Sequence, residues 1–374
     1  MIAPQEIRSL ADRAPSERPV VSLFLDVSVN AENKRTHHVF LNKQRARFSE
    51  LDSERARHHL ESMGAFLSRV EGWLETDFDE ANRGVALYAE LGDDWFHAVQ
   101  LPVPVANRLE MADRPLLEPL AQAFSGHPRF AVALVDREHL RLLAVRMGRL
   151  IAEVAWSPEA VPVPHDVQAG GMSQKDIQKR KAEETRQFYR DFAERMAEFD
   201  RRHRPQHWIL AGTTENVQNF REFVSPPLEA RVAATTHAPF DVPTAEIVQR
   251  LAGTFEEVTA RASAEAVEQA RDRLRTGHRA VGGMREVLEV LQEGKVAGLV
   301  VSAEAQREGS ECARCGFLLT RTAGPCPYCG GDVRDGVDLV EAILRIAVRR
   351  EVPVEFVDDG ALHEASGVGA LLAF

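Results

Sequence analysis

Residues 130–156, FAVALVDREHLRLLAVRMGRLIAEVAW, decide the fold of the middle of the chain. They contain three short runs of apolar and β-branched residues, a pattern that predicts three strands. Asp136-Arg137-Glu138 separates the first run from the second, and Met147-Gly148-Arg149 separates the second from the third. Because such short connections join neighbouring antiparallel strands, this stretch predicts a three-stranded antiparallel meander.

A long segment without regular periodicity follows the meander. Residues 157–174 contain prolines and glycines, and a loop of this length in a compact domain is usually functional or disordered. One long helix is then predicted from Lys175 to Arg202, because apolar residues recur along one of its faces: Phe188, Phe192, Met196 and Phe199. A buried strand is expected at 208–212, and a further helix closes this central domain, residues 128–262.

The flanking parts also alternate between strands and helices. Residues 19–26, PVVSLFLD, predict a strand, and residues 37–75 predict a helical stretch whose buried face holds Leu60, Met63, Leu67, Val70 and Leu74. With a second strand at 84–88, residues 1–127 are expected to form an N-terminal α/β domain. Residues 263–374 begin with a charged helix at 264–275 and then alternate helix and strand, which predicts a third domain with an α/β sandwich. The chain is therefore expected to be a mixed α/β protein of three domains.

Composition limits the classes of function. No run of 18 uncharged apolar residues occurs, and the first residues lack a basic patch followed by an apolar run, so we expect a cytoplasmic protein without a membrane partner. The net charge is −11, and such a surface repels nucleic acid at long range. Any contact with RNA must therefore come from a local basic patch.

Four cysteines predict a metal site. Cys312, Cys315, Cys326 and Cys329 form the pattern CxxC-x10-CxxC, with a glycine after each pair. Two residues between thiolates allow both pairs to converge on one tetrahedral Zn²⁺, and four thiolates leave no position for a reactive water. We therefore predict a structural zinc ribbon over residues 309–334, inserted in the third domain. Two local disulfides or a metal-free knuckle are the alternatives.

A second candidate site lies at the end of the long loop. Gly170 and Gly171 permit positive φ angles, and the helix that starts near Gln174 presents unpaired N–H groups to an anion. The cations Lys175, Lys179, Arg180 and Lys181 outnumber the single acid Asp176, so a charge of +3 covers seven residues. This patch can hold RNA phosphate. A simple hinge followed by a solvated helix face is the alternative interpretation.

These features, in this order, resemble a known family. A Gly-Gly loop with a nearby Gln, between a strand meander and a basic helix, resembles the central domain of archaeal and eukaryotic class-1 release factors. The final segment, Gly367-Val-Gly-Ala-Leu-Leu-Ala-Phe374, resembles the end of their third domain. Bacterial archaeo-eukaryotic release-factor-like proteins, relatives of these factors and of Pelota, often begin with a VSLFLD-like strand, as at 21–26 here. The resemblance implies an RNase-H-like central domain and a third domain like kink-turn-binding ribosomal proteins.

The resemblance also implies a site at the ribosome. In the release factors a Gly-Gly-Gln tripeptide positions water against the ester of peptidyl-tRNA, and by analogy Gly170 and Gly171 shape the loop while Gln174 orients water. Here Met172 and Ser173 separate the glycines from the glutamine, and a misplacement of about 1 Å can cost a hundredfold in rate. Motifs that read stop codons are not found in residues 1–127.

Three functions therefore stay open. The first is a factor that occupies the ribosomal A site and contacts rRNA and P-site tRNA. It protects idle ribosomes or rescues stalled ones, with a translational GTPase as a partner. The second is peptidyl-tRNA hydrolysis through Gln174. The third is a zinc-ribbon adaptor that acts away from the ribosome. A metal-dependent nuclease is disfavoured, because Asp136 lacks an evident set of carboxylate partners.

Overall fold

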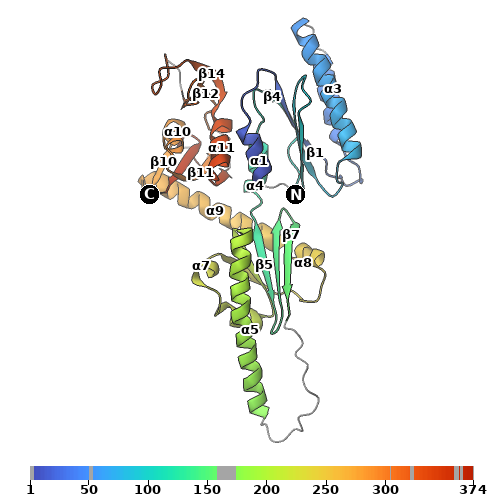
Figure 1. Cartoon of the computed structure of the whole chain (residues 1–374), viewed down its shortest axis with the longest axis vertical. Helices are drawn as coiled ribbons and strands as arrows, with labels where there is room; N and C mark the ends of the chain where they lie inside the picture. The colour runs from blue at the N-terminus through green and yellow to red at the C-terminus, as the bar shows by residue number, and fades with distance from the viewer. Residues whose placement is uncertain are drawn as a thin grey trace. The chain divides into compact units, whose positions relative to one another are not determined.

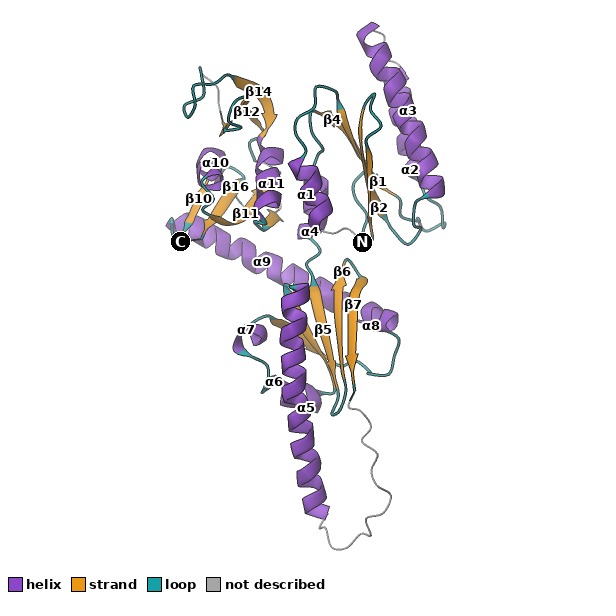
Figure 2. Ribbon diagram, viewed as in Figure 1, coloured by secondary structure: helices purple, strands orange, loops and turns teal. Residues whose placement is uncertain are grey.

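The structure is a computed structural model that describes residues 4–49, 54–157, 174–303, 305–320, 324–357, 362 and 365–373. It divides into two compact units. Figure 1 colours the chain by residue number, and Figure 2 colours it by secondary structure. The first unit combines residues 1–126 with residues 263–374, and the second consists of residues 127–262. The predicted mixed α/β class is confirmed. The division into three domains stays a prediction.

The second unit is built on a five-stranded sheet of order β7-β6-β5-β8-β9. β5, β6 and β7 pair antiparallel, as the predicted meander requires, whereas β5, β8 and β9 pair parallel. The RNase-H-like character that the resemblance implies for this domain stays a prediction. Its strands are β5 (Phe130–Val135), β6 (Leu140–Arg146), β7 (Arg149–Trp156), β8 (His207–Gly212) and β9 (Val232–Thr236).

Helices cover both faces of this sheet. Successive residues of β5 point to opposite faces, so Ala131 and Ala133 belong to one apolar cluster and Val132 and Leu134 to the other. The first cluster is completed by α5 (Gln174–His203), through Tyr189, Phe192, Met196 and Phe199, and by α6 (Thr214–Arg221) and α7 (Pro226–Glu229). The second cluster is completed by α8 (Thr244–Arg250) and by the first turns of α9 (Ala252–Thr276).

The N-terminal part of the first unit has an antiparallel sheet of order β3-β2-β1-β4. One face packs against α2 (His37–Ser49) and α3 (Glu54–Thr76) through Leu41, Met63, Leu67 and Val70, all of which are buried. The strands are β1 (Val20–Asp26), β2 (Gly84–Glu90), β3 (Phe96–Leu101) and β4 (Arg108–Ala112), and the shorter helices are α1 (Pro4–Asp12) and α4 (Glu118–Ser125).

The C-terminal part of the first unit is an α/β sandwich, as predicted. Its sheet has the order β10-β16-β11-β15, with α10 and α11 on one face and Ala270 and Leu274 of α9 on the other. The elements are β10 (Ala280–Gly282), α10 (Met284–Gln292), β11 (Val296–Ser302), α11 (Leu339–Arg350), β15 (Val354–Val357) and β16 (Val368–Leu372). Residues 264–275 are helical, as predicted, but they form the second half of α9, which starts at Ala252 and contains no proline to interrupt it.

A buried arginine joins the two chain segments of the first unit. The Arg345 side chain of α11 is 5% exposed, and its guanidinium donates to the carbonyl oxygens of Leu10, Ala11 and Pro115 at 3.0, 2.9 and 2.7 Å. The Leu10 and Ala11 carbonyls belong to the last turn of α1, where a helix leaves its carbonyls unpaired. Arg345 therefore caps a helix that lies more than 330 residues earlier in the chain.

One turn before Arg345, a glutamate caps a second helix of the N-terminal part. The Glu341 carboxylate accepts hydrogen bonds from the backbone N–H groups of Leu117 and Glu118, each at 2.8 Å, at the start of α4. Burial raises the pKa of Glu341 to about 7, against the pull of these donors and of Arg345. The two side chains fix α11 against both ends of the N-terminal segment.

Among the described residues, no helix combines the length and apolar character needed to cross a bilayer.

Candidate functional site

The cysteine pattern lies on a small antiparallel sheet of order β13-β12-β14. Its strands are β12 (Glu308–Cys312), β13 (Leu318–Leu319) and β14 (Val333–Asp338), and together they fill the chain between β11 and α11. The Asp338 side chain ends this insert and accepts hydrogen bonds from the N–H groups of Val340 and Glu341, which starts α11. The predicted ribbon is therefore a discrete insert in the sandwich, and we call residues 308–338 the ribbon.

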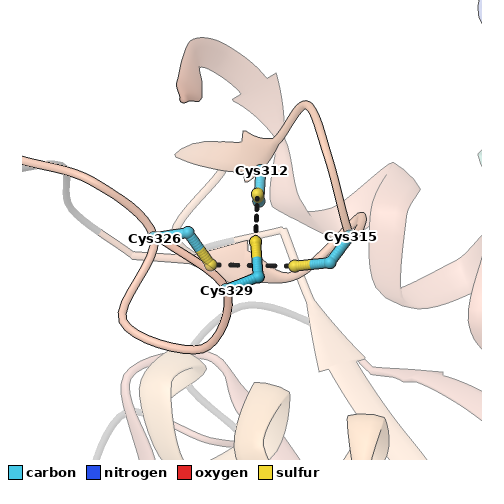
Figure 3. A group of neighbouring side chains, drawn as sticks. All are labelled: Cys312, Cys315, Cys326 and Cys329. Carbon is cyan, nitrogen blue, oxygen red and sulfur yellow. Dashed lines mark hydrogen bonds between the residues drawn. The ribbon is translucent and has the colours of Figure 1, made fainter. Parts of the chain in front are cut away.

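The four sulfur atoms converge on one point (Figure 3). All four Sγ atoms lie within 4.8 Å of one another, with Cys312 and Cys329 separated by 3.5 Å and Cys315 and Cys326 by 3.7 Å. A tetrahedral ion with metal–sulfur bonds of about 2.3 Å needs sulfurs about 3.8 Å apart, so the spacing fits such an ion. The four residues are free thiols, which argues against the alternative of two local disulfides. The cluster can hold a metal ion.

The two halves of the cluster repeat one backbone arrangement. Gly316 and Gly330 follow the two cysteine pairs with φ angles of 72° and 68°, a region that favours glycine. Their N–H groups donate to the carbonyl oxygens of Cys312 and Cys326, both at 2.9 Å. Hydrogen bonds led by the backbone N–H of Cys315 lower the pKa of the Cys312 thiol to about 6. The Phe317 N–H favours the Cys315 thiolate, but burial and the other three cysteines outweigh it and raise the pKa of Cys315 to about 12. A thiolate is the form of cysteine that binds metal.

Ion pairs attach the ribbon to the N-terminal part of the first unit. The Glu311 carboxylate on β12 accepts from the Arg114 guanidinium at 2.8 and 3.1 Å and from the Arg334 guanidinium on β14 at 2.9 Å. Arg334 also lies 2.9 Å from the Asp113 carboxylate. The ribbon is thus held by side chains of a segment about 200 residues away in sequence. Sequence reasoning missed these residues, because no local pattern pairs them.

A second ion pair supports the base of the ribbon. Burial disfavours the charge on Glu118, but hydrogen bonds and charge from Arg307 and Arg108 hold the pKa of this carboxyl below its usual value. The Arg307 guanidinium lies 2.6 Å from the Glu118 carboxylate and 3.2 Å from that of Asp338. Since Glu118 is 4% exposed, its charge is a fixed partner for Arg307 rather than a free surface group.

The predicted loop is only partly covered by the structure. Gly170 and Gly171 lie outside the described residues. Gln174 is the first residue of α5. The same helix contains the four predicted RNA-binding cations, Lys175, Lys179, Arg180 and Lys181. Their side chains lie outside what the structure describes. The roles assigned to these residues stay predictions.

Asp136, the carboxylate considered for a nuclease, makes hydrogen bonds within the turn between β5 and β6. Its side chain accepts from the backbone N–H groups of Glu138 and His139 at 2.8 and 2.6 Å and lies 3.0 Å from Nδ1 of His139. These contacts stabilise the turn between β5 and β6. Within the described ranges, the four cysteines are the one group of three or more His, Cys, Asp or Glu side chains placed to hold a metal.

Comparison with known families identifies the central part of the chain. Residues 115–256 match the family model described as bacterial archaeo-eukaryotic release factor family 10. Over these residues the chain is similar to the bacterial archaeo-eukaryotic release-factor-like family. The matched region contains the whole five-stranded sheet, α5 and the loop that precedes α5. No curated protein matches the chain.

Several solved structures are similar over most of the chain. The archaeal translation termination factor aRF1 is 14% identical, with a TM-score of 0.26, and the match covers 100% of this chain and 99% of aRF1. Archaeal Pelota, from a model of its ribosome-bound form with ABCE1, is 13% identical, with a TM-score of 0.40 and coverage of 100% and 94%. Dom34 of S. cerevisiae is 10% identical, with a TM-score of 0.38 and coverage of 80% and 81%.

Proposed function

We propose that this release-factor-like protein is a ribosome-associated translation factor that occupies the A site. In this proposal the Gly170-Gly171 loop points toward the peptidyl-transferase centre, and the protein protects idle ribosomes or helps to rescue stalled ones. The family match over residues 115–256 supports a role in translation. A translational GTPase is proposed as a further partner, on the resemblance to the release factors.

The observation that carries the proposal is the length of α5 that precedes its first buried side chain among those described. In the part of α5 whose side chains are described, Tyr189 is the first buried residue, and the helix begins at Gln174. Fifteen residues at 1.5 Å each place the start of the helix about 22 Å from that first buried side chain. Figure 1 shows α5 continuing past the sheet of its own unit. In this proposal the residues that precede Gln174 reach a partner, because the start of α5 lies away from the buried part of the helix.

The position of Gln174 favours binding over hydrolysis. Gln174 is the first residue of α5, so its backbone belongs to the helix. Met172 and Ser173 stand between the turn and the glutamine. Orientation of an attacking water demands placement to about 1 Å, which a two-residue insertion removes. Peptidyl-tRNA hydrolysis is therefore the second candidate function.

One experiment separates the two functions. Wild-type protein and the Gln174→Ala variant are incubated with ribosomes that carry labelled peptidyl-tRNA in the P site. Tight binding by both proteins, with no peptide released, supports the A-site occupant. Release that is lost in the variant supports the hydrolase.

A second variant tests the cationic start of α5. The triple variant carries Lys179→Ala, Arg180→Ala and Lys181→Ala. Its affinity for ribosomes in co-sedimentation should fall about tenfold or more, and the salt dependence of that affinity should decrease. The matched control is Arg201→Ala with Arg202→Ala, two exposed cations at the other end of the same helix, and it should bind as wild type does. If neither variant nor wild type binds ribosomes at physiological salt, the adaptor function becomes the leading one, and a pull-down with and without residues 309–334 tests it.

A further inference from the structure

The cysteine site forms most of the interior of the ribbon. Within the described residues of the ribbon, four side chains are buried: Ser310, Cys312, Leu318 and Cys326. Two of these are cysteines of the site, and Leu318 belongs to the apolar cluster of the sandwich. A segment this short, without an apolar core of its own, depends on a bound metal for its fold. The positions of the ribbon strands therefore depend on the four sulfur atoms.

One of the four sulfur atoms is open to solvent. Cys315 is exposed, whereas Cys312 and Cys326 are buried. The Sγ atoms of Cys315 and Cys326 lie 3.7 Å apart and those of Cys312 and Cys329 lie 3.5 Å apart, so each pair joins the two halves of the ribbon (Figure 3). An oxidant can reach the Cys315 sulfur, and a second sulfur lies beside it. The chain contains four cysteines in all, so oxidation of thiols acts on this site alone.

The residue next to the site carries a link to the N-terminal part of the first unit. Glu311 immediately precedes Cys312, and its carboxylate lies 2.8 Å from the Arg114 guanidinium. The link is partly buried, since 14% of the Glu311 side chain and 18% of the Arg114 side chain are exposed. A different strand attaches the ribbon to the sandwich: the Leu318 N–H donates to Oε1 of Gln292 at 2.8 Å, and Nε2 of Gln292 donates to the Leu318 carbonyl oxygen at 3.3 Å. A movement of Cys312 therefore acts first on the Glu311 link.

We propose that the ribbon is an oxidation-sensitive switch, in which a peroxide converts the four thiolates into two disulfides, the metal ion leaves, and the link between Glu311 and Arg114 opens. The inference rests on the predicted metal site. It goes beyond the proposed function, because it gives the first unit a response to oxidants that needs no ribosome.

The chemistry balances with hydrogen peroxide as the oxidant. The Cys315 thiolate attacks one peroxide oxygen, so that an S–O bond forms, the O–O bond breaks, and the leaving hydroxide takes a proton to become water. The Cys326 thiolate then attacks the Cys315 sulfur, the S–S bond forms, the S–O bond breaks, and a second hydroxide leaves as water after it takes a proton. Cys312 and Cys329 consume a second peroxide in the same way. The metal ion thereby loses all four ligands.

The disulfides do not fit the present positions of the sulfur atoms. A disulfide requires sulfurs about 2.05 Å apart, so each pair must close by roughly 1.5 Å. Cys312 moves with its pair, and Glu311 moves with Cys312 because the two are consecutive in the chain. The Arg114 guanidinium belongs to the other chain segment and does not follow this movement. Oxidation is therefore expected to separate the two charged groups.

The test treats full-length, reduced, zinc-loaded protein with hydrogen peroxide. A chromogenic chelator measures zinc release, peptide mapping identifies the disulfides, and hydrogen exchange measures opening of the backbone at residues 111–116. We expect one zinc released per chain and exchange at 111–116 faster by about tenfold or more, since a hydrogen-bonded charge pair is lost. Dithiothreitol and added zinc should reverse both changes. Zinc that stays bound when the thiols are oxidised, or zinc release with unchanged exchange at 111–116, overturns the proposal.

A variant of the link separates this switch from simple unfolding of the ribbon. Glu311→Gln removes the charge without touching a sulfur, so before oxidation it should keep its zinc and already show the faster exchange at 111–116. Peroxide should then change that exchange by less than about twofold, because the two perturbations act on one contact. Glu308→Gln, an exposed position on the same strand, is the matched control and should behave as wild type does.

If peroxide accelerates exchange in Glu311→Gln as much as in wild type, the effect does not pass through this link and the proposal is wrong. Because the assay contains no ribosome, its result is independent of the co-sedimentation test of α5.

Discussion

Replacement of Arg345 by methionine tests the contact that joins the two chain segments of the first unit. Methionine has a similar length and fills the space of the aliphatic stem, but it donates no hydrogen bonds. The change leaves three buried carbonyl oxygens, those of Leu10, Ala11 and Pro115, without the donors that now lie 2.7–3.0 Å away. It also removes the positive charge that favours ionisation of Glu341.

The expected cost follows from burial. A hydrogen bond from a charged donor contributes about 1.5–3 kcal/mol, but the three bonds of Arg345 do not simply add, because methionine also avoids the desolvation of a guanidinium. A buried acceptor left without its donor costs about 1–3 kcal/mol, and because three acceptors are affected we expect a loss of about 3–5 kcal/mol in the free energy of unfolding of the first unit. Burial lowers the pKa of Arg345 to about 10, so the side chain is charged at neutral pH.

The assay is urea denaturation, with hydrogen exchange of the amides near residues 10–11 and 115–118 to assign the change to the contact. Arg349→Met is the control on the same helix, because its ion pair with Asp12, at 2.9 Å, joins side chains that are 42% and 56% exposed. Such an exposed pair contributes less than about 1 kcal/mol. If Arg345→Met costs no more than Arg349→Met, the buried arginine does not hold the two segments together.

Three further predictions concern the metal, pH and the second unit. Purified, reduced protein should hold one zinc per chain, and absence of zinc would contradict the site. A chelator should make residues 309–334 sensitive to protease, while the second unit keeps its melting temperature. Because burial raises the pKa of Glu341 from 4.5 to about 7, the folded protein keeps a proton that the unfolded chain loses, and stability falls as pH rises through that window. Glu341→Gln removes this effect. Between pH 4.5 and 8, wild type should therefore lose about 3 kcal/mol of unfolding free energy relative to the variant. Parallel pH profiles of the two proteins would contradict the assignment. Gly212→Ala should destabilise the second unit by about 2–4 kcal/mol in thermal denaturation, since a Cβ there lies 2.3 Å from the Val135 carbonyl oxygen at a φ of 150°. Gly148→Ala is the control and should cost about 1 kcal/mol, because Gly148 has a φ of 70° but open space around it. Equal costs would show that the close approach does not matter.

Local patterns predicted the elements that depend on neighbouring residues. The meander of β5, β6 and β7 follows from apolar runs joined by short turns, and its antiparallel pairing is confirmed. α5 begins and ends within one residue of the predicted bounds, since its apolar face repeats over several turns. The cysteine cluster was also predictable, because two CxxC pairs bring their sulfurs together over a short stretch of chain.

Contacts between distant residues were not predictable from one sequence. β16 lies between β10 and β11 in the sheet, although Gly369 weakens its strand pattern. β3 and β4 were missed because polar and apolar residues mix in both strands. Helix α9 crosses the predicted boundary at residues 262 and 263, since alanine and serine there do not stop a helix. The pairing of Glu311 with Arg114 and the roles of the loop residues lie beyond what spacing alone determines.

The discontinuous build of the first unit has a consequence for its biosynthesis. The Pro115 carbonyl and the Arg345 side chain that caps it are 230 residues apart in the chain. At about 5–20 residues per second, the N-terminal segment waits roughly 10–50 s for its partner after it has been made. In sequence, the second unit lies wholly between the two segments, so it can form its sheet during that interval. A nascent chain arrested before α11 would therefore display a finished centre and an N-terminal segment whose helix caps are still missing.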